Sequence, residues 1–355
     1  MLGQKRIRHY GFTIGTLPTG PRNSISDVAG VTVGHCTLND GPVKTGVTAI
    51  LPHPGNLFQD KVLAAAHVIN GFGKTAGTIQ IEELGTIETP ILLTNTLSVG
   101  TAADALIEYM LERNPDIGVT TGTVNAVVGE CNDMYLNDIR GRHVQKEHVF
   151  QALDSASADF AEGAVGAGTG MSCYGLKGGI GSASRRIELG DESYMVGVLV
   201  LSNFGAKGDL TIGGVPFGRL IEEQERASSQ ESDKGSIMIV LATDLPLSER
   251  QLKRVGKRAA IGLARTGSFI GHGSGDIVLA FTTANRVPHA QTASVNMIRM
   301  VHEDLLDPAF RAAAEATEEA VLNSMICAQT TVGRDGNTRH SLQEYMHLIQ
   351  TTPGP

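Results

Sequence analysis

The sequence predicts a layered α/β protein, in which sheets stack on each other and helices flank them. Segments with helical apolar spacing alternate along the chain with short, continuously apolar segments, which are typical of strands buried on both faces. Hydrophobic residues make up 41% of the 355 residues and charged residues 19%, so a sizeable core can form. The 43 glycines lie among aliphatic residues, which indicates tight turns and close backbone approaches rather than disorder.

Helices are expected in five places. Apolar residues recur at helical spacing in three segments, namely residues 59–70, 101–112 and 147–162. Ser248 lies three residues before Gln251, which is the spacing of a capping box, so a fourth helix is expected from there until Gly267. Asp307 and Pro308 match an N-cap and a first-turn proline, and they predict the fifth helix.

Strands are expected in five apolar segments, namely residues 46–52, 89–94, 193–202, 236–243 and 276–283. No internal repeat or low-complexity tract divides the chain. Only residues 219–235 resemble a linker, because their second half is charged, rich in serine and nearly free of apolar residues. We expect this segment to be exposed and mobile.

Charge and cysteine spacing exclude several classes of protein. A net charge of −8 does not suit a nucleic-acid binder or an anionic membrane surface, since both need clustered Lys and Arg. The sequence shows no signal peptide and no apolar run long enough to span a membrane. The four cysteines, Cys36, Cys131, Cys173 and Cys327, form no CxxC pair, which indicates free thiols in a cytoplasmic protein.

A serine begins one of the expected buried strands, directly after a glycine. In SDKGSIMIVLATDL (232–245), a charged run ends at Gly235, and Ser236 precedes an unbroken apolar segment. One interpretation is an ordinary turn with a polar residue at its exit. The other is that the Gly235–Ser236 bond is cut, which would make Ser236 a new N-terminus. The residues alone leave both interpretations open.

Polar side chains also mark the ends of two of the expected strands. Ser274 and Asp276, in the motif GHGSGDI, are two residues apart and would share one face of an extended chain. Asn203 ends another apolar strand, where its amide could face a developing oxyanion. Ordinary turns would explain both observations as well, and His272 of the same motif is interpreted as structural.

The segment AVVGECNDMYLNDI (126–139) gathers acidic residues around a tyrosine. It contains Glu130, Asp133, Tyr135 and Asp138. Acids beside a tyrosine could receive the ammonium group of a substrate. A solvated loop would show the same pattern, and the pattern alone favours the loop.

Three motifs resemble cofactor sites, but each lacks a required part. Gly166, Gly168 and Gly170 are spaced like part of a dinucleotide fingerprint, yet they follow a helix and open none. GFGKT (71–75) lacks the earlier glycine of a phosphate loop. HEDLL (302–306) lacks the second histidine of a zinc helix. The sequence therefore predicts no cofactor and no metal site.

Taken together, long segments resemble the L-aminopeptidase D-Ala-esterase/amidase family, also called DmpA-like, which includes the β-peptidyl aminopeptidases. The resemblance runs almost from end to end. It covers SDVAGVTVGH (26–35), ETPILLTNTLSVG (88–100), GAVGAGTGMSCYGLKGGIGSASR (163–185), VLSNFGAKGDLTIGG (200–214), DKGSIMIVLATDLPL (233–247), GHGSGDIVLAFTTAN (271–285) and AVLNSMICAQTTVGRDG (320–336).

The resemblance implies a fold and a processing step. The fold would be a four-layer αββα sandwich, similar in architecture to N-terminal-nucleophile hydrolases but different in connectivity. A single catalytic domain over residues 1–355 would cut itself between Gly235 and Ser236. The larger piece, 1–235, and the smaller piece, 236–355, would stay associated, and relatives form tetramers of such processed units.

The resemblance also implies roles for residues around the new N-terminus. Asn203 matches the oxyanion-binding asparagine, and Ser274 and Asp276 match a second serine and an acid beside the nucleophile. Glu130 matches the acid that holds the free amino group of the substrate. Tyr135 is assigned to the substrate site by its neighbourhood. The implied activity is the release of single N-terminal residues from small peptides, amides or esters through an acyl-enzyme on the serine.

Two alternatives remain beside this serine aminopeptidase. The first is an acyltransferase like the ornithine acetyltransferases, which carry threonine at the cleaved position where this chain has Ser236. The second is a member that never cleaves and serves as a binding or structural protein. The joint presence of Ser236, Ser274, Asp276 and Asn203 argues against the second alternative.

Overall fold

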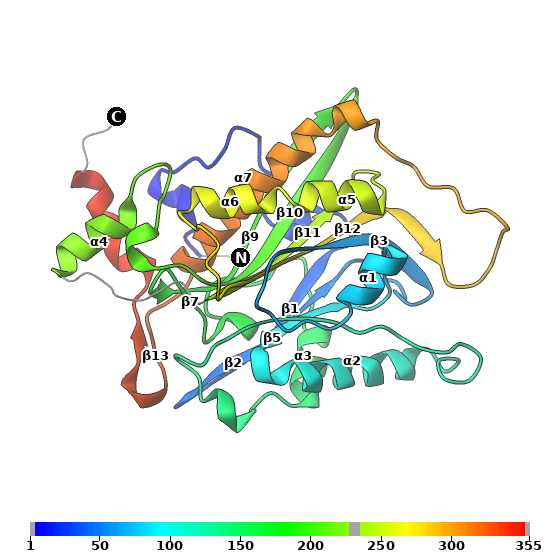
Figure 1. Ribbon diagram of the computed structural model, residues 1–355, viewed down its shortest axis with the longest axis horizontal. Helices are drawn as coiled ribbons and strands as arrows, with labels where there is room; N and C mark the ends of the chain where they lie inside the picture. The colour runs from blue at the N-terminus through cyan, green and yellow to red at the C-terminus, as the bar shows by residue number, and fades with distance from the viewer. Residues whose placement is uncertain (1–3, 227–234, 352–355) are drawn as a thin grey trace.

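Two β-sheets form the centre of the computed structural model, which describes residues 4–226 and 235–351 (Figure 1). The smaller sheet has the strand order β1 (Thr32–Asp40), β2 (Val43–Leu51), β5 (Ile91–Asn95), β6 (Val127–Cys131). The larger sheet has the order β4 (Thr86–Ile87), β3 (Asp60–Gly71), β12 (Gly275–Pro288), β11 (Ser236–Thr243), β10 (Glu192–Asn203), β9 (Gly179–Leu189). In the larger sheet β11 runs parallel to β12 and antiparallel to β10. The first residues of β11 and β12 therefore meet the last residue of β10.

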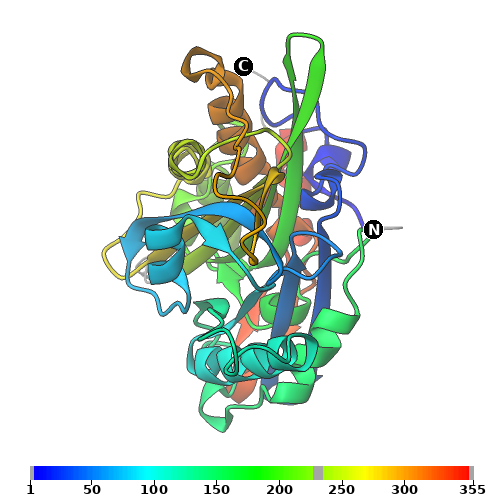
Figure 2. The ribbon, with the colours of Figure 1, turned by 90° about the vertical axis from the view of Figure 1, so that its right-hand side faces the viewer.

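Helices cover the outer face of each sheet, so the protein has four layers (Figure 2). The smaller sheet is covered by α2 (Val99–Arg113) and α3 (Lys146–Asp154). The larger sheet is covered by α5 (Glu249–Gly256), α6 (Ala259–Arg265) and α7 (Asp307–Ile326). Two further helices, α1 (Thr78–Leu84) and α4 (Phe217–Glu225), lie at the periphery. The αββα arrangement expected from the family resemblance is confirmed.

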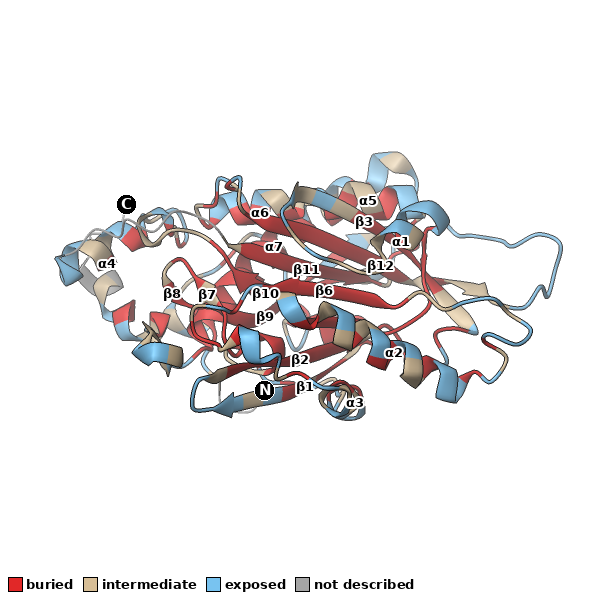
Figure 3. Ribbon diagram, turned by 60° about the horizontal axis from the view of Figure 1, so that its bottom comes forward, coloured by how far each residue is buried: buried red, intermediate tan, exposed pale blue. Residues whose placement is uncertain are grey.

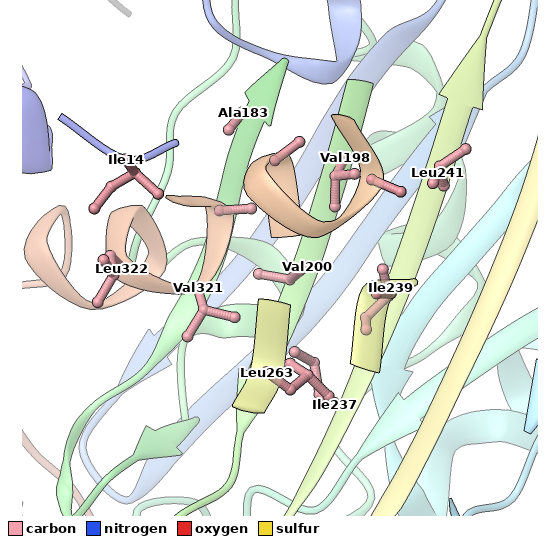
Figure 4. Close-up of a cluster of buried hydrophobic side chains, with 14 of the residues drawn as sticks. Ile14, Ala183, Val198, Val200, Ile237, Ile239, Leu241, Leu263, Val321 and Leu322 are labelled. Carbon is pink, nitrogen blue, oxygen red and sulfur yellow. The ribbon is translucent and has the colours of Figure 1, made fainter. Parts of the chain in front are cut away.

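Three hydrophobic clusters fill the three interfaces between the layers. Figure 4 shows the cluster under the larger sheet, where Ile237 and Ile239 of β11 lie in one core with Val321 of α7. The alternate β11 residues, Met238 and Val240, belong to the cluster between the two sheets. A third cluster joins the smaller sheet to α2 and α3. Successive residues of β11 point to opposite faces of the sheet, and a hydrophobic core covers each face. Every residue of this strand is therefore buried.

This central position makes β11 a rigid support for its first residue. Figure 3 shows the strands around β11 as the buried centre of the molecule, with exposed residues on the surrounding helices and loops. Of the strands expected from the sequence, that over 236–243 coincides with β11. Those over 46–52, 89–94, 193–202 and 276–283 fall on β2, β5, β10 and β12 with shifted boundaries.

The helix expected over residues 59–70 is wrong, because this segment is strand β3. Its apolar residues serve both faces of the larger sheet. Val62 and Ala64 face the smaller sheet, whereas Leu63 and Ala65 face the helices. An alanine-rich strand buried on both faces shows no period-two alternation, so its apolar pattern resembles that of a helix.

The helix expected over residues 147–162 ends early, at Asp154. The chain beyond it pairs with β1 instead. Ser157 and Val33 exchange two backbone hydrogen bonds of 3.0 Å. Pairing with a distant strand thus replaces the second half of the predicted helix.

The helix expected from Ser248 to Gly267 is two helices, because α5 packs on β3 whereas α6 packs on α7. The capping box of Ser248 and Gln251 is confirmed. Asp307 is the first residue of α7 rather than its N-cap, which is Leu306. A short 3₁₀ turn directly before Leu306 already brings the backbone into helical geometry.

The linker-like segment 219–235 lies only partly within the described residues. Its first part belongs to α4, and residues 227–234 lie outside the described residues. The expected mobility of this segment therefore stays a prediction. None of the helices in the described ranges has the length and apolar character needed to cross a membrane.

Candidate active site

Ser236 lies where three strand ends of the larger sheet meet. It is the first residue of β11 and pairs with Asn203 of β10 on one side and with Gly275 of β12 on the other. Its side chain is buried and, by strand alternation, lies on the face of Met238, toward the smaller sheet. The peptide before it is also held, because the Gly275 N–H donates to the Gly235 carbonyl oxygen at 3.2 Å.

The glycine before Ser236 is required by close packing. A Cβ at Gly235 would lie 2.0 Å from the backbone oxygen of Asn203 and 2.3 Å from the Cα of Phe204. Both contacts are with backbone atoms, which cannot move aside as a side chain can. Any larger residue at position 235 would therefore displace the chain at this bond.

The amide of Asn203 is fixed in one orientation. Its Oδ1 accepts the Ser172 N–H at 2.8 Å, and its Nδ2 donates to the Asn132 carbonyl at 3.0 Å. An amide nitrogen has two N–H donors, so one remains for a group bound at the paired residue Ser236. The structure thus brings Asn203 to the place that the sequence predicted, with its donor end fixed by two loops.

Ser274 and Asp276 form a hydrogen-bonded pair beside Ser236. The Ser274 hydroxyl donates to Asp276 Oδ1 at 2.7 Å, and both side chains are buried. The prediction that the two side chains share a face is confirmed by this contact. They flank Gly275, which pairs with Ser236, while Asp276 itself stands opposite Ile237. The pair therefore lies along the backbone of Ser236. His272, interpreted as structural, is exposed.

Glu130 is a buried carboxylate near the same strand ends. Its Oε1 accepts the Lys74 N–H at 2.9 Å, and its Oε2 accepts the Thr96 hydroxyl. A Cβ at Gly73 would lie 3.7 Å from Glu130 Oε1 and 3.6 Å from the Cα of Gly275. Gly73 therefore lies between Glu130 and β12. Within the described residues no Lys, Arg or His forms an ion pair with Glu130, although it is buried.

The solvated-loop interpretation of residues 126–139 is wrong for Glu130 and Asp133. Glu130 is part of strand β6, and Asp133 is buried in the turn that follows it. Asp133 Oδ1 accepts the Asn137 side-chain amide at 3.0 Å, and burial raises the pKa of Asp133 to about 7. Asp138 is bound by His143 at 3.1 Å instead. The apolar residues before Glu130 indicate the strand. The charged residues after it suggest exposure, so the sequence does not show that the chain stays buried as far as Asp133.

Cys131 is a site residue that the sequence interpretation missed. Its thiol donates to the Leu201 carbonyl at 3.4 Å and lies beside the Ser236 side chain. Burial raises the pKa of this thiol well above its ordinary value, so it stays neutral beside the serine. A scattered single cysteine gave no signal of this contact, which depends on how the two sheets pack.

Tyr135 and Arg339 stand on the Asn203 side of Ser236. The Tyr135 ring lies under the guanidinium of Arg339, 3.7 Å from ring centre to guanidinium carbon, and among the described residues no hydrogen bond joins Tyr135 to Glu130. The Arg339 Nε–H donates to the Ser172 hydroxyl at 3.1 Å, and the Ser172 N–H holds Asn203. Arg339 was not predicted, because it is distant in sequence and belongs to no recognisable motif.

The glycine-rich segment before β9 is held by a buried lysine. The Lys177 ammonium donates to the carbonyls of Gly168, Met171 and Gly178 at 2.8–2.9 Å. Burial lowers the pKa of Lys177 to about 7. These three bonds fix the loop that carries Ser172, and through it the amide of Asn203.

Comparisons with known proteins agree with this geometry. The family model described as Peptidase family S58 matches residues 23–339. The beta-peptidyl aminopeptidase BapA of Sphingosinicella microcystinivorans is 40% identical over 355 residues, covering 94% of this chain and 88% of that protein. BapA of Sphingosinicella xenopeptidilytica is 38% identical over 354 residues, covering 94% of this chain and 87% of that protein.

Solved structures match over nearly the whole chain. The PH0078 protein from Pyrococcus horikoshii OT3 has a TM-score of 0.92 and 53% identity, covering 98% of this chain and 99% of that one. The L-aminopeptidase D-Ala-esterase/amidase from Ochrobactrum anthropi has a TM-score of 0.90 and 38% identity, covering 98% of both chains. That protein is described as a prototype for the serine aminopeptidases and as a new variant among the Ntn hydrolase fold.

Proposed function

Because the chain belongs to peptidase family S58 and is an aminopeptidase, we propose that it cuts its Gly235–Ser236 bond and then uses Ser236 as its nucleophile. The observation that carries this proposal is the place of Ser236 at the start of a fully buried strand, paired with Asn203 and Gly275. The matching family and the named relatives are peptidases, which favours this function over an acyltransferase or a non-catalytic member.

Self-cleavage follows from groups at the bond. The Ser236 hydroxyl oxygen attacks the Gly235 carbonyl carbon, the C–N bond breaks, and the nitrogen takes up the proton as an ester forms. Water then hydrolyses the ester and leaves the Gly235 carboxylate and the Ser236 hydroxyl and amine. The Gly275 N–H, 3.2 Å from the Gly235 oxygen, is placed to stabilise the developing oxyanion.

The order of strands supports lasting association of the two pieces. Residues 1–235 contribute β10 and residues 236–355 contribute β11, and these neighbours are paired over eight positions from Val196–Thr243 to Asn203–Ser236. β12 of the smaller piece is in turn paired with β3 of the larger one. Separation would break strand pairing on both sides and expose two buried cores.

Turnover would use the amine that cleavage creates. An α-amine has a pKa of about 8, so it can take the proton of the Ser236 hydroxyl near neutral pH. Ser274 and Asp276, which lie along the Ser236 backbone, are placed to position that amine or relay its proton. The free N–H of Asn203 would stabilise the oxyanion as the acyl-enzyme forms.

Substrate choice would depend on Glu130. Glu130 is a buried carboxylate, and no cationic side chain among the described residues forms an ion pair with it. Because an unpaired buried charge is costly, such a carboxylate favours the ammonium group of a substrate. We therefore propose the release of one N-terminal residue from small peptides, amides or esters. The names of the relatives support both β-amino acids and L-α-amino acids as the released residue. Tyr135 would contact the substrate on the Asn203 side.

The processing step is tested by intact mass and a denaturing gel. The wild-type chain should separate into two pieces with a new N-terminus at Ser236. Ser236→Ala should stay uncut and lose activity on an amino-acid p-nitroanilide at least about a thousandfold. Ser193→Ala, at an exposed position of β10, is the matched control and should be cut and active. A Ser236→Ala chain that still splits would contradict the proposed nucleophile.

The tetramer implied by the family resemblance stays a proposal. The segment after β12 supports association, because residues 290–300 are all exposed and form the loop that extends from the body in Figure 1. The segment carries four large apolar side chains: Val295, Met297, Ile298 and Met300. Such exposure is typical of surfaces that other chains cover. Light scattering on the processed protein measures the mass and tests for four units.

A further inference from the structure

We propose that Arg339 binds the C-terminal carboxylate of the leaving group, which would make short peptides with a free C-terminus the preferred substrates. This inference rests on the proposed function, because it takes Ser236 as the point of cleavage. It starts from a guanidinium that is fixed beside the site and that the proposed chemistry does not use.

Arg339 is held in place by contacts on two sides. It belongs to β14 (Thr338–Arg339), which pairs with β13 (Thr331–Val332) in a small hairpin. The Tyr135 ring lies against one face of its guanidinium, Ser172 accepts its Nε–H at 3.1 Å, and the Gly175 carbonyl accepts from its Nη1 at 3.4 Å. Arginine offers five N–H donors in a planar fork, a number that allows structural contacts and carboxylate recognition by the same side chain.

Glu130 and Arg339 lie on opposite sides of Ser236. Glu130 lies on the β12 side of Ser236, where Gly73 stands between its Oε1 and Gly275. Arg339 lies on the β10 side, where Ser172 links it to Asn203. Since β11 stands between β12 and β10, the two opposite charges flank the nucleophile.

A dipeptide carries the matching charges in the matching order. Its ammonium group lies before the scissile carbonyl, and its carboxylate lies after it. With the ammonium group at Glu130 and the carbonyl at Ser236, the leaving amino acid would extend toward Asn203 and Arg339. A substrate bound in this direction pairs both of its charges, and the reverse direction pairs neither.

Burial supports a role in binding rather than in the chemical step. Ser236 and Asn203 are buried, whereas Tyr135, Ser172 and Arg339 are half-buried and form the edge of the site. A carboxylate bound at this edge keeps part of its hydration. Its contribution is therefore moderate, and we expect about a tenfold effect on KM from a charge-assisted bond in this setting.

The test uses three substrates that share one accepted N-terminal residue. They are a dipeptide with a free carboxylate, the same dipeptide as its C-terminal amide, and the p-nitroanilide. In the processed enzyme, Arg339→Gln should raise KM for the free dipeptide about tenfold and change both neutral substrates less than about twofold. Arg339→Lys should recover part of the loss, because it restores the charge without the planar fork.

A matched control lies on the same hairpin. Arg334 forms an ion pair with Asp335 at 3.9 Å. Among the described residues it is Arg339, not Arg334, whose guanidinium lies over the Tyr135 ring. Arg334→Gln should leave the ratio of KM values between the free dipeptide and its amide unchanged. A shift of this ratio equal to that of Arg339→Gln would overturn the assignment to Arg339.

Two further outcomes would also overturn the inference. If Arg339→Gln lowers kcat equally for all three substrates, Arg339 acts only by positioning Ser172 and Asn203. If no KM changes, it has no role in binding. Inactivity of the wild-type enzyme on all three substrates is a separate result, since it would overturn the proposed function itself. The neutral substrates thus report on the basic activity, and the free dipeptide alone reports on Arg339.

Discussion

The two sides of Ser236 are built in opposite ways. On the β12 side Glu130 is buried, and it is held by a backbone N–H and a hydroxyl. On the β10 side Arg339 is half-buried, and it is held by an aromatic ring and a serine hydroxyl. Each side carries one charge, but the two sides differ in their access to water.

This difference in burial separates a strict requirement from an adjustable preference. A buried carboxylate without a cation strongly favours an ammonium partner, and water cannot replace that partner. A half-exposed guanidinium exchanges its partner for water at little cost. We therefore expect the free amino group to be required of every substrate, whereas the carboxylate of the leaving group only tunes affinity.

Asn203 lies on the β10 side, but its proposed role in binding the oxyanion would serve any substrate, so its loss should have the largest effect. Asn203→Ala removes the proposed oxyanion donor, and kcat should fall about a hundredfold or more for charged and neutral substrates alike. Steady-state kinetics on a dipeptide and its amide measure both effects. Intact mass tells whether the variant is still cut.

An isosteric variant separates the lost donor from lost packing. Asn203→Asp keeps the shape of the side chain but replaces the N–H donor by an oxygen. It should lose activity as severely as Asn203→Ala. Near-normal kcat in either variant would show that a group other than the Asn203 amide stabilises the oxyanion.

Loss of the charge of Glu130 should have the next largest effect, confined to substrates with a free amino group. Glu130→Gln keeps the size of the side chain and removes its charge. The kcat/KM of an amino-acid ester should fall about thirtyfold, because one partner of a buried charge pair is lost. The ester without the amino group, a poor substrate of the wild type, should be little affected.

The ratio of these two esters is the measurement that decides the role of Glu130. It should shrink in Glu130→Gln and stay unchanged in Asp138→Asn, which alters a more exposed acid of the same segment. If the ratio is unchanged in Glu130→Gln, the substrate ammonium group binds to another residue. Glu130 would then impose no strict requirement on the substrate, and the two sides of Ser236 would not differ in this respect.

The sequence predicted the fold and the nucleophile neighbourhood better than it predicted the edge of the site. The motifs around Ser236 and Ser274 are continuous stretches of sequence. They can therefore be recognised without knowledge of the fold, and the family resemblance implies the roles of their residues. Cys131 and Arg339 reach the site only through sheet stacking and hairpin placement, which no local pattern records. The segment 59–70 failed for a related reason, since burial on both faces removes the alternation that indicates a strand.

The smallest expected effect concerns the turn that joins the two sides. Asp133 lies between Glu130 and Tyr135 in sequence and is bound by Asn137 at 3.0 Å. Burial raises its pKa from an ordinary 3.8 to about 7. Between these values the folded chain binds more protons than the unfolded chain, so this group makes the folded state less stable as pH rises from about 4 to about 7.

Asp133→Asn removes this titration while keeping the shape of the side chain. The melting temperature of the variant, relative to wild type, should therefore rise by a few degrees between pH 5 and pH 8. Asp138→Asn, at a more exposed acid, should show no such trend. A flat difference for Asp133→Asn would mean that Asp133 stays ionised, balanced by the nearby buried Lys177. The turn would then contain a buried carboxylate, and its hydrogen bond from Asn137 would be charge-assisted rather than neutral.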